Sequence, residues 1–176
     1  MKGDGTIRRG QSSHSLNQLI GAGVAAGVIS ALVKSGVETL LPPRLPDAVP
    51  PPIGLLELLG FDATGMTYRF SDQVVNWGGN GVHILFSVVI AVIYCLLVQA
   101  KPIFRAGQGM PFGLAMGLGA HILVLPIIGV GPMFWTIPFE GYVSEIVGTI
   151  IWIWTIECVR RALLADSQSY LRSITH

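Results

Sequence analysis

The sequence Ile29-Ser-Ala-Leu-Val-Lys34-Ser-Gly-Val-Glu38-Thr-Leu-Leu-Pro42-Pro43-Arg44 determines how we interpret the rest of the chain. An apolar helix here carries a lysine and a glutamate one turn apart and then meets two prolines, which cannot continue it. A charged side chain at the centre of a bilayer costs roughly 2.5–3.5 kcal/mol on insertion scales. Lys34 and Glu38 therefore need a partner, water or a function.

Composition places the chain among membrane proteins. Of its 176 residues, 51% are hydrophobic and 12% are charged, and the mean hydropathy is +0.62. Charged residues make up about a quarter of an ordinary soluble domain. The formal net charge of +1 offers no basic face for nucleic acid. We therefore expect the lipid bilayer, and no nucleic acid, as a partner.

Four apolar segments are each long enough to cross about 30 Å of hydrocarbon as a helix. They cover approximately residues 16–40, 79–99, 111–130 and 141–159. The sequence therefore predicts an all-α membrane protein, a four-helix transmembrane bundle within residues 16–160.

Basic residues outside the spans are unevenly distributed. One side of the four spans carries Lys2, Arg8, Arg9, Lys101, Arg105, Arg160, Arg161 and Arg172, and the other carries Arg44 and Arg69. Cytoplasmic loops carry the excess of lysine and arginine. We therefore expect both termini in the cytoplasm, with residues 1–15 as a flexible N-terminus and 161–176 as a tail.

The outer loop, residues 41–76, opens with a proline-rich stretch that cannot form a helix. It continues with Ile53-Gly-Leu-Leu-Glu-Leu-Leu-Gly60-Phe61, which is too short to span. We expect a short helix lying in the outer interface, with a lid over the mouth of the bundle as the alternative.

Small residues recur at every fourth position of two spans. The first span carries Gly23, Gly27, Ala31 and Ser35, and the third carries Gly109, Gly113 and Gly117, followed by His121. Small residues at this spacing let helices approach closely in lipid. We expect contacts within the bundle, with a homo-oligomer interface on the first and third spans as the alternative.

Five titratable side chains fall in the outer half of the predicted bundle or at its midplane: Lys34, Glu38, His83, His121 and Glu145. One ammonium then faces two carboxylates, and a dry site would not tolerate the excess negative charge. We therefore expect Lys34, Glu38 and Glu145 to form a buried charged cluster whose protonation depends on pH. His83 and His121 are the candidate proton acceptors.

Five polar residues lie where they can support this cluster: Ser30, Arg44, Asn76, Ser144 and Thr149. Ser30 shares the helix face of Lys34, and Thr149 shares that of Glu145. Three uses of the cluster remain open. The first is a structural ion pair that fixes helix register, the second a solvent-accessible proton or ion pathway, and the third a catalytic site.

Enzyme signatures are absent, since there is no Gly-x-Ser-x-Gly, no His-Glu-x-x-His and no phosphate loop. Cys95 and Cys158 are too few ligands for a metal site. We expect no enzymatic activity, no cofactor and no metal.

Three charged residues lie at the predicted cytoplasmic boundary: Glu157, Arg160 and Arg161. Pairs at i,i+3 and i,i+4 spacing would anchor the helix end there.

A series of short motifs covers nearly the whole chain after its first fifteen residues. In order they are Val33-Lys34 through Pro42-Pro-Arg44, Tyr68-x-Phe70 with Val75-Asn76-Trp77, His83-Ile-x-Phe-Ser87 with Tyr94-Cys95, His121 before Pro126, Ser144-Glu145-Ile146 with Gly148, and Ile156-Glu157-x-x-Arg160-Arg161. This order resembles the bacterial YagU family of inner-membrane proteins. The resemblance implies a protein that contributes to acid resistance by an unknown route.

The leading hypothesis is a pH-responsive proton or ion pathway built on the buried cluster. The alternatives are a non-transporting scaffold or assembly factor and a membrane enzyme acting on a lipid-like substrate. A wet crevice that reaches Lys34 favours transport, and a dry, fully paired cluster favours the scaffold. A lateral groove of lipid size that meets the carboxylates favours the enzyme.

Overall fold

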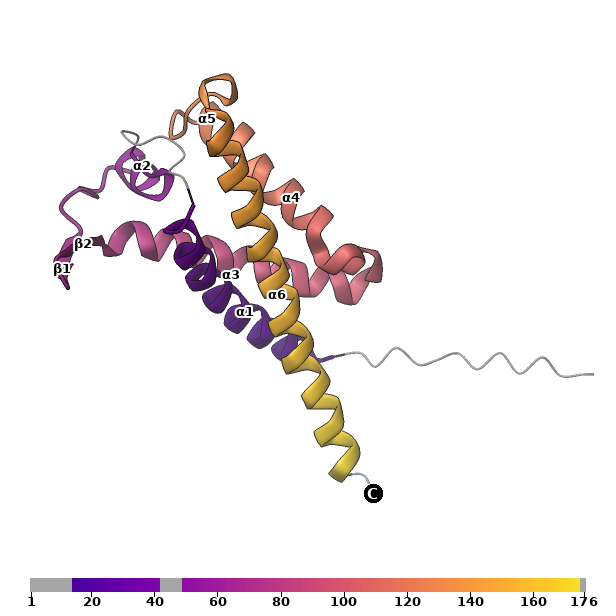
Figure 1. Cartoon of the computed structure of the whole chain (residues 1–176). Coiled ribbons are helices and arrows are strands. Elements are labelled where there is room, and N and C mark those ends of the chain that lie inside the picture. The colour runs from indigo at the N-terminus through magenta and orange to yellow at the C-terminus, as the bar shows by residue number, and fades with distance from the viewer. Residues whose placement is uncertain (1–13, 42–48, 175–176) are drawn as a thin grey trace, which may run out of the picture.

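Four helices of membrane length make up the computed structural model, which describes residues 14–41 and 49–174, with side chains to Ala165. They are α1 (Leu16–Glu38), α3 (Trp77–Ala100), the segment Pro102–Ile127 and α6 (Phe139–Ile174) (Figure 1). All four are long and apolar enough to cross a membrane. The predicted all-α, four-span fold is confirmed. Arg44, which we expected to support the cluster, lies outside the described residues.

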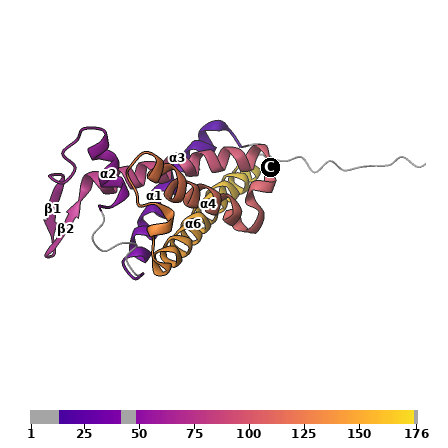
Figure 2. The ribbon, with the colours of Figure 1, turned by 90° about the horizontal axis from the view of Figure 1, so that it is seen from above.

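Helix α1 lies at the centre of the arrangement, because it packs along both α3 and α6, while α4 (Met110–Leu118) packs on α6. The turns of η1 (Pro102–Gly109) contact α3, α4 and α6. From η1, α3 and α4 run in diverging directions (Figure 1). In the view from above, α6 runs beside α4 toward the C-terminal end of the chain (Figure 2). We refer to the end of the bundle that holds η1 as the η1 end.

The helices begin at residues that satisfy their free backbone N–H groups. Ser15 caps α1 by accepting from the N–H of Gln18, whose side chain accepts from the N–H of Ser15. Asn76 caps α3 by accepting from the N–H of Gly79 at 2.7 Å. The α3 cap fixes where the helix leaves the outer loop, and with it the position of His83.

The small residues of α1 and α4 are used within the chain. A Cβ on Gly23 would lie 2.6 Å from the Cα of Val92 on α3, and one on Gly117 would lie 2.6 Å from the side chain of Thr149 on α6. These rows therefore make the close helix contacts that we expected inside the bundle. A homo-oligomer stays a prediction, and it would have to use other surfaces.

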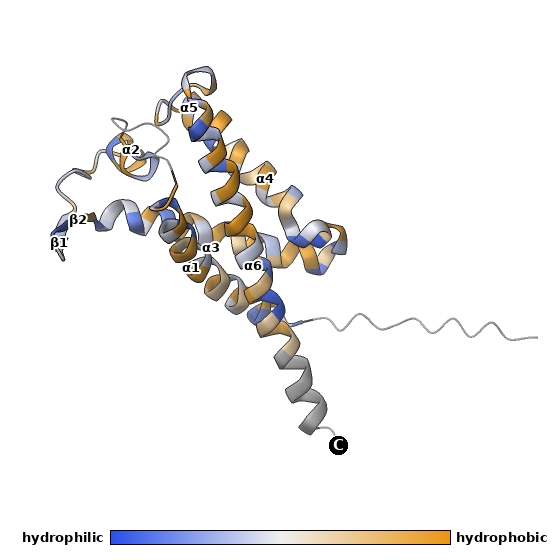
Figure 3. Ribbon diagram, viewed as in Figure 1, coloured by the Kyte–Doolittle hydropathy of each residue, from blue (hydrophilic) through white to orange (hydrophobic). Residues whose placement is uncertain are grey.

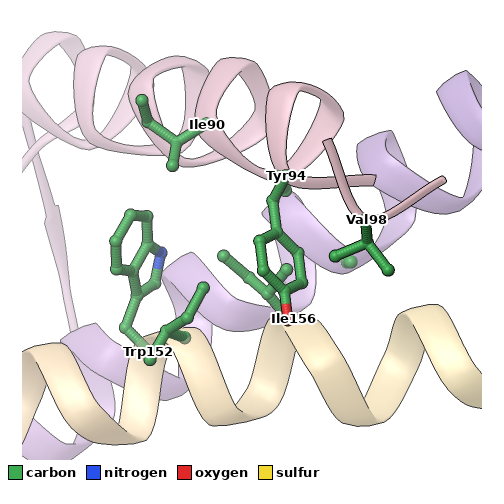
Figure 4. Close-up of a cluster of buried hydrophobic side chains, with 8 residues drawn as sticks. Ile90, Tyr94, Val98, Trp152 and Ile156 are labelled. Atoms are coloured by element: carbon green, nitrogen blue, oxygen red, sulfur yellow. The ribbon is translucent and has the colours of Figure 1, made fainter. Parts of the chain in front are cut away.

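An apolar core lies between α3 and α6 at the level of Ile90, Tyr94, Trp152, Ile153 and Ile156. Figure 4 shows the rings of Tyr94 and Trp152 pointing into the space between the two helices. The indole of Trp152 donates to Oγ of Ser87 at 2.7 Å. Ser87 also hydrogen-bonds Ser30 at 3.0 Å. Ser30 therefore joins α1 to α3, rather than supporting the charged cluster as we predicted.

The third span is not one continuous α-helix. After α4 comes a π-helical segment, η2 (Gly119–Val124), followed by the single turn α5 (Leu125–Ile127). Pro126 has no N–H to donate and crowds the carbonyl four residues earlier, and such positions are relieved by a wider turn. His121 lies within this wider turn.

The outer loop contains two features at the other end of the bundle, which we call the hairpin end. Helix α2 (Pro51–Leu58) packs on the start of α3, where Gly79 makes room for Ile53. Strands β1 (Thr67–Phe70) and β2 (Gln73–Asn76) form an antiparallel hairpin that we did not predict. The short turn η3 (Phe134–Thr136) precedes α6.

Helix α6 is longer than predicted. We expected the fourth span to end near residue 159, yet the helix continues through 36 residues to Ile174, about 54 Å at 1.5 Å per residue. Figure 3 shows mostly hydrophobic, orange residues along the middle of α6 and a hydrophilic, blue band further along the helix. Glu157 therefore lies within the helix and not at its end.

Candidate functional site

A cavity of about 540 Å³ lies at the hairpin end, between α1, α2, α3, η2 and the start of α6. We call it the polar cavity. Its lining includes all five predicted titratable residues: Lys34, Glu38, His83, His121 and Glu145. The bundle thus brings together side chains from four separate segments of the chain.

Lys34 pairs with Glu38 on the same helix, with 2.6 Å between Nζ and Oε1. The lysine side chain is 5% exposed and the glutamate side chain 30%. On α6, a Cβ at Gly148 would lie 3.1 Å from Nζ. The absence of a side chain at Gly148 therefore leaves room for the ammonium where α1 meets α6.

Nδ1 of His121 lies 3.0 Å from Oε1 of Glu145 and 3.0 Å from the carbonyl oxygen of Gly117. A carbonyl oxygen can only accept a hydrogen bond, so Nδ1 must carry a hydrogen. Nε2 is therefore the nitrogen through which the neutral ring can take up a further proton. The same carboxylate oxygen accepts from Oγ1 of Thr149 at 3.0 Å, so Thr149 supports Glu145 as predicted.

His83 projects from α3 toward the same cavity. Its Nε2 is buried and has no hydrogen-bond partner among the residues that the structure describes. Such a nitrogen is costly unless water or a ligand reaches it. His83 is therefore the clearest position for a molecule that enters the cavity.

The remaining predicted residues have different positions. Asn76 and Ser144 line the polar cavity, and Asn76 also donates to the carbonyl of Ala63 at 2.7 Å. The lining further includes Asn80 and Tyr142, which we did not predict. Asn80 precedes His83 by three residues and so shares its helix face, a signal that was present in the sequence. Tyr142 donates to the carbonyl of Phe134 and had no such signal.

A second hollow, of about 290 Å³, adjoins the first and lies between α3, the α4–α5 region and the prolines of α2. We call it the lateral pocket. Its apolar lining includes Leu55, Phe86, Val124 and Trp152. Lys34, His83 and His121 border both hollows.

A separate group of polar side chains is buried toward the η1 end, and we call it the Glu157 network. Arg160 donates to both carboxylate oxygens of Glu157, from Nε at 2.7 Å and from Nη2 at 2.9 Å. The hydroxyl of Tyr94 on α3 donates to the same carboxylate at 3.1 Å. Glu157 is 2% exposed.

The predicted anchor at the helix end is therefore wrong in part. The Glu157–Arg160 pair forms, but inside the core between α3 and α6. Arg161 donates instead to the side chain of Gln108 in η1 at 3.2 Å. No ion pair joins Arg161 to Glu157 in the described part of the chain.

The chemistry available at the polar cavity is proton exchange. It holds an ammonium, two carboxylates and two imidazoles beside one space. Within residues 14–41 and 49–165, no three His, Cys, Asp or Glu side chains come together in a way that would hold a metal ion.

Comparison with known proteins relates the chain to one family. Residues 28–158 match a family described as "Protein of unknown function (DUF1440)". The chain is 35% identical over 167 residues to inner membrane protein YagU of Escherichia coli (strain K12), an alignment that covers 80% of this chain and 81% of the relative. No solved structure matches.

Proposed function

Because the chain belongs to the YagU family (DUF1440) and is a multi-pass inner-membrane protein, we propose that it contributes to acid resistance as a pH-responsive proton or ion pathway. The polar cavity is the part of this pathway that takes up protons. The hairpin end faces outward, and both termini lie in the cytoplasm.

One observation carries the proposal: a single cavity borders five titratable side chains from α1, α3, η2 and α6. Water can enter it, since the side chains of Glu38 and His121 are 30% and 22% exposed. Such access to Lys34 supports transport over a dry structural pair.

Falling pH changes the charge of the cavity. Histidine is the side chain that changes charge between about pH 5 and 8. Each imidazole that takes up a proton adds one positive charge to the cavity, so acid conditions make the cavity less attractive to cations.

Conduction also requires a route through the apolar core. Trp152, Ile153 and Ile156 fill the space between α3 and α6 below the cavity. The proposed pathway therefore starts at the hairpin end and needs a change in this core to continue. The interrupted helix at η2 carries His121 and is the segment where a charge change can alter the packing of α4 on α6.

A second candidate is a non-transporting scaffold or assembly factor. It is favoured by the Glu157 network, which is dry and fully paired and joins α3 to α6. We assign no enzymatic step to the polar cavity.

The test is proton and ion flux in proteoliposomes at neutral and acidic external pH. We expect acid-dependent flux in the native protein that Lys34→Met and Glu145→Gln both reduce by about tenfold or more, the effect of about 1.4 kcal/mol or more on a barrier. Glu140→Gln is the matched control, because Glu140 is exposed on the same helix as Glu145.

Equal flux in the native protein and in all three variants would show that conduction does not depend on the polar cavity. Absence of flux from a folded, uniformly oriented sample would contradict the proposed pathway and favour the scaffold. Survival of cells at low pH with the same variants tests the contribution to acid resistance.

A further inference from the structure

The lateral pocket has an apolar body. Apart from a few polar residues at one end, its lining consists of aliphatic and aromatic side chains, prolines and small residues from α2, α3, α4, η2, α5 and α6. Phe86 stacks on Trp152 along one wall, with ring centroids 6.1 Å apart. Pro51, Pro52 and Leu55 of α2 close the pocket toward the hairpin end.

The polar end of the pocket is basic. Lys34, His83, His121 and Thr149 border it, whereas Glu38 and Glu145 border only the polar cavity. All five members of the cluster border the polar cavity, whereas the lateral pocket meets only its basic groups.

Hydrogen-bonding groups at this end remain available to a ligand. The ammonium of Lys34 has three hydrogens, and Glu38 is the one acceptor for them among the described residues. Nε2 of His83 is buried without a partner there. A carboxyl group placed between the two side chains would accept a hydrogen bond from the ammonium of Lys34 and match its charge. It would also share one proton with Nε2 of His83 in a second hydrogen bond.

The pocket lies beside the surface that the spans present to lipid. Phe86, Val124 and Ile128 line it and are 36%, 54% and 39% exposed. Their neighbours Leu85, Leu123 and Ile127 are apolar and more exposed still. In a bilayer these side chains face the acyl chains, so a ligand would enter from the membrane.

From this arrangement we propose that the lateral pocket binds one long-chain fatty acid, with its carboxylate between Lys34 and His83 and its chain against Phe86 and Trp152. The lateral pocket, at about 290 Å³, is smaller than the polar cavity at about 540 Å³, so the proposal commits to a single acyl chain, and a phospholipid is one of the outcomes that the test separates. The inference does not depend on proton movement through the cavity.

Trp152 provides a direct readout, because it lines the pocket while Trp77, Trp135 and Trp154 are exposed. The test uses two single-tryptophan proteins in nanodiscs, one retaining Trp152 and one retaining Trp154, with phenylalanine at the other three positions. The quencher is stearate carrying two bromine atoms in mid-chain. We expect the fluorescence of Trp152 to be quenched at low quencher content and to reach saturation. For Trp154 we expect quenching that rises in proportion to the brominated stearate in the bilayer, without saturation.

Three further comparisons identify the site in the Trp152 protein. Lys34→Met, and separately the methyl ester of the same quencher, should each weaken binding by about tenfold or more, because a hydrogen bond to a charged group is worth about 1.5–3 kcal/mol. Ala120→Phe should abolish saturation by filling the pocket that Ala120 lines. Ala115→Phe, at an exposed position of the same span, should leave binding unchanged.

The proposal fails if Trp152 and Trp154 are quenched alike, or if the acid and its ester bind equally. It also fails if a phospholipid brominated in mid-chain quenches Trp152 as well as the free acid does. The ester comparison uses unaltered side chains at the site, so it decides the question even where Lys34→Met or Ala120→Phe does not fold. Flux and fatty-acid binding are measured separately, so either proposal can fail alone.

Discussion

The polar cavity and the Glu157 network place similar charges in very different surroundings, although α6 contributes a glutamate to each. In the Glu157 network a carboxylate meets a guanidinium through two hydrogen bonds, a tyrosine adds a third, and the glutamate is 2% exposed. In the polar cavity the cation and carboxylates border open space, and Glu38 is 30% exposed.

This difference separates a structural use of buried charge from a responsive one. A bidentate arginine is always charged and holds one geometry, so the Glu157 network has no reason to change between neutral and acid pH. The polar cavity instead borders two imidazoles, the side-chain type whose ordinary pKa lies in that range. We therefore expect substitutions in the network to act on stability and those in the cavity to act mainly on the response to pH.

The largest loss of unfolding free energy should come from Arg160→Met. Removal of one partner from a buried ion pair leaves the other charge uncompensated, which costs about 3–5 kcal/mol. The free energy of unfolding can be measured by SDS titration in mixed micelles. Arg161→Met is the control, since Arg161 makes one exposed hydrogen bond to Gln108, and its cost should stay below about 1 kcal/mol. Equal losses in both variants would mean that the network is not the dry centre of the fold.

Lys34→Met should cost less, about 1–2 kcal/mol in the same assay. Glu38 then loses its contact with the ammonium, but its carboxylate is 30% exposed and water can replace the ammonium. The ratio between the losses of unfolding free energy in Arg160→Met and Lys34→Met indicates how well water reaches the charges of the polar cavity. A loss for Lys34→Met as large as that for Arg160→Met would show a dry cavity and would favour the scaffold.

The sequence was sufficient for the spans and for the membership of the cluster. Span length follows from hydropathy, and counting residues inward along each helix placed Lys34, His83 and Glu145 at similar depth. Their pairing could not be predicted in this way, because it depends on how each helix is rotated. Lys34 pairs with Glu38, while Glu145 pairs with His121.

Two local features escaped prediction for physical reasons. The hairpin turns at Ser71 and Asp72, with φ of 48° and 63°, a conformation usually signalled by asparagine or glycine. Glu157 was counted as a helix-end residue because the apolar run stops near residue 159, whereas α6 continues to Ile174. Its contact with Tyr94 spans 63 positions of sequence, which no local pattern encodes.

The smallest effect should come from Thr149→Val, which keeps the side-chain shape against Gly117 and removes the hydroxyl that donates to Glu145. Loss of this hydrogen bond should cost about 1 kcal/mol. The control is Thr155→Val on the same helix, where the hydroxyl donates only to the carbonyl of Ile151. Such a contact within a helix slightly destabilises it, so its removal should cost less. If Thr149→Val also shifts the pH at which flux begins while Thr155→Val does not, Thr149 helps to set the protonation of the cavity; a stability change without that shift would assign it to packing alone.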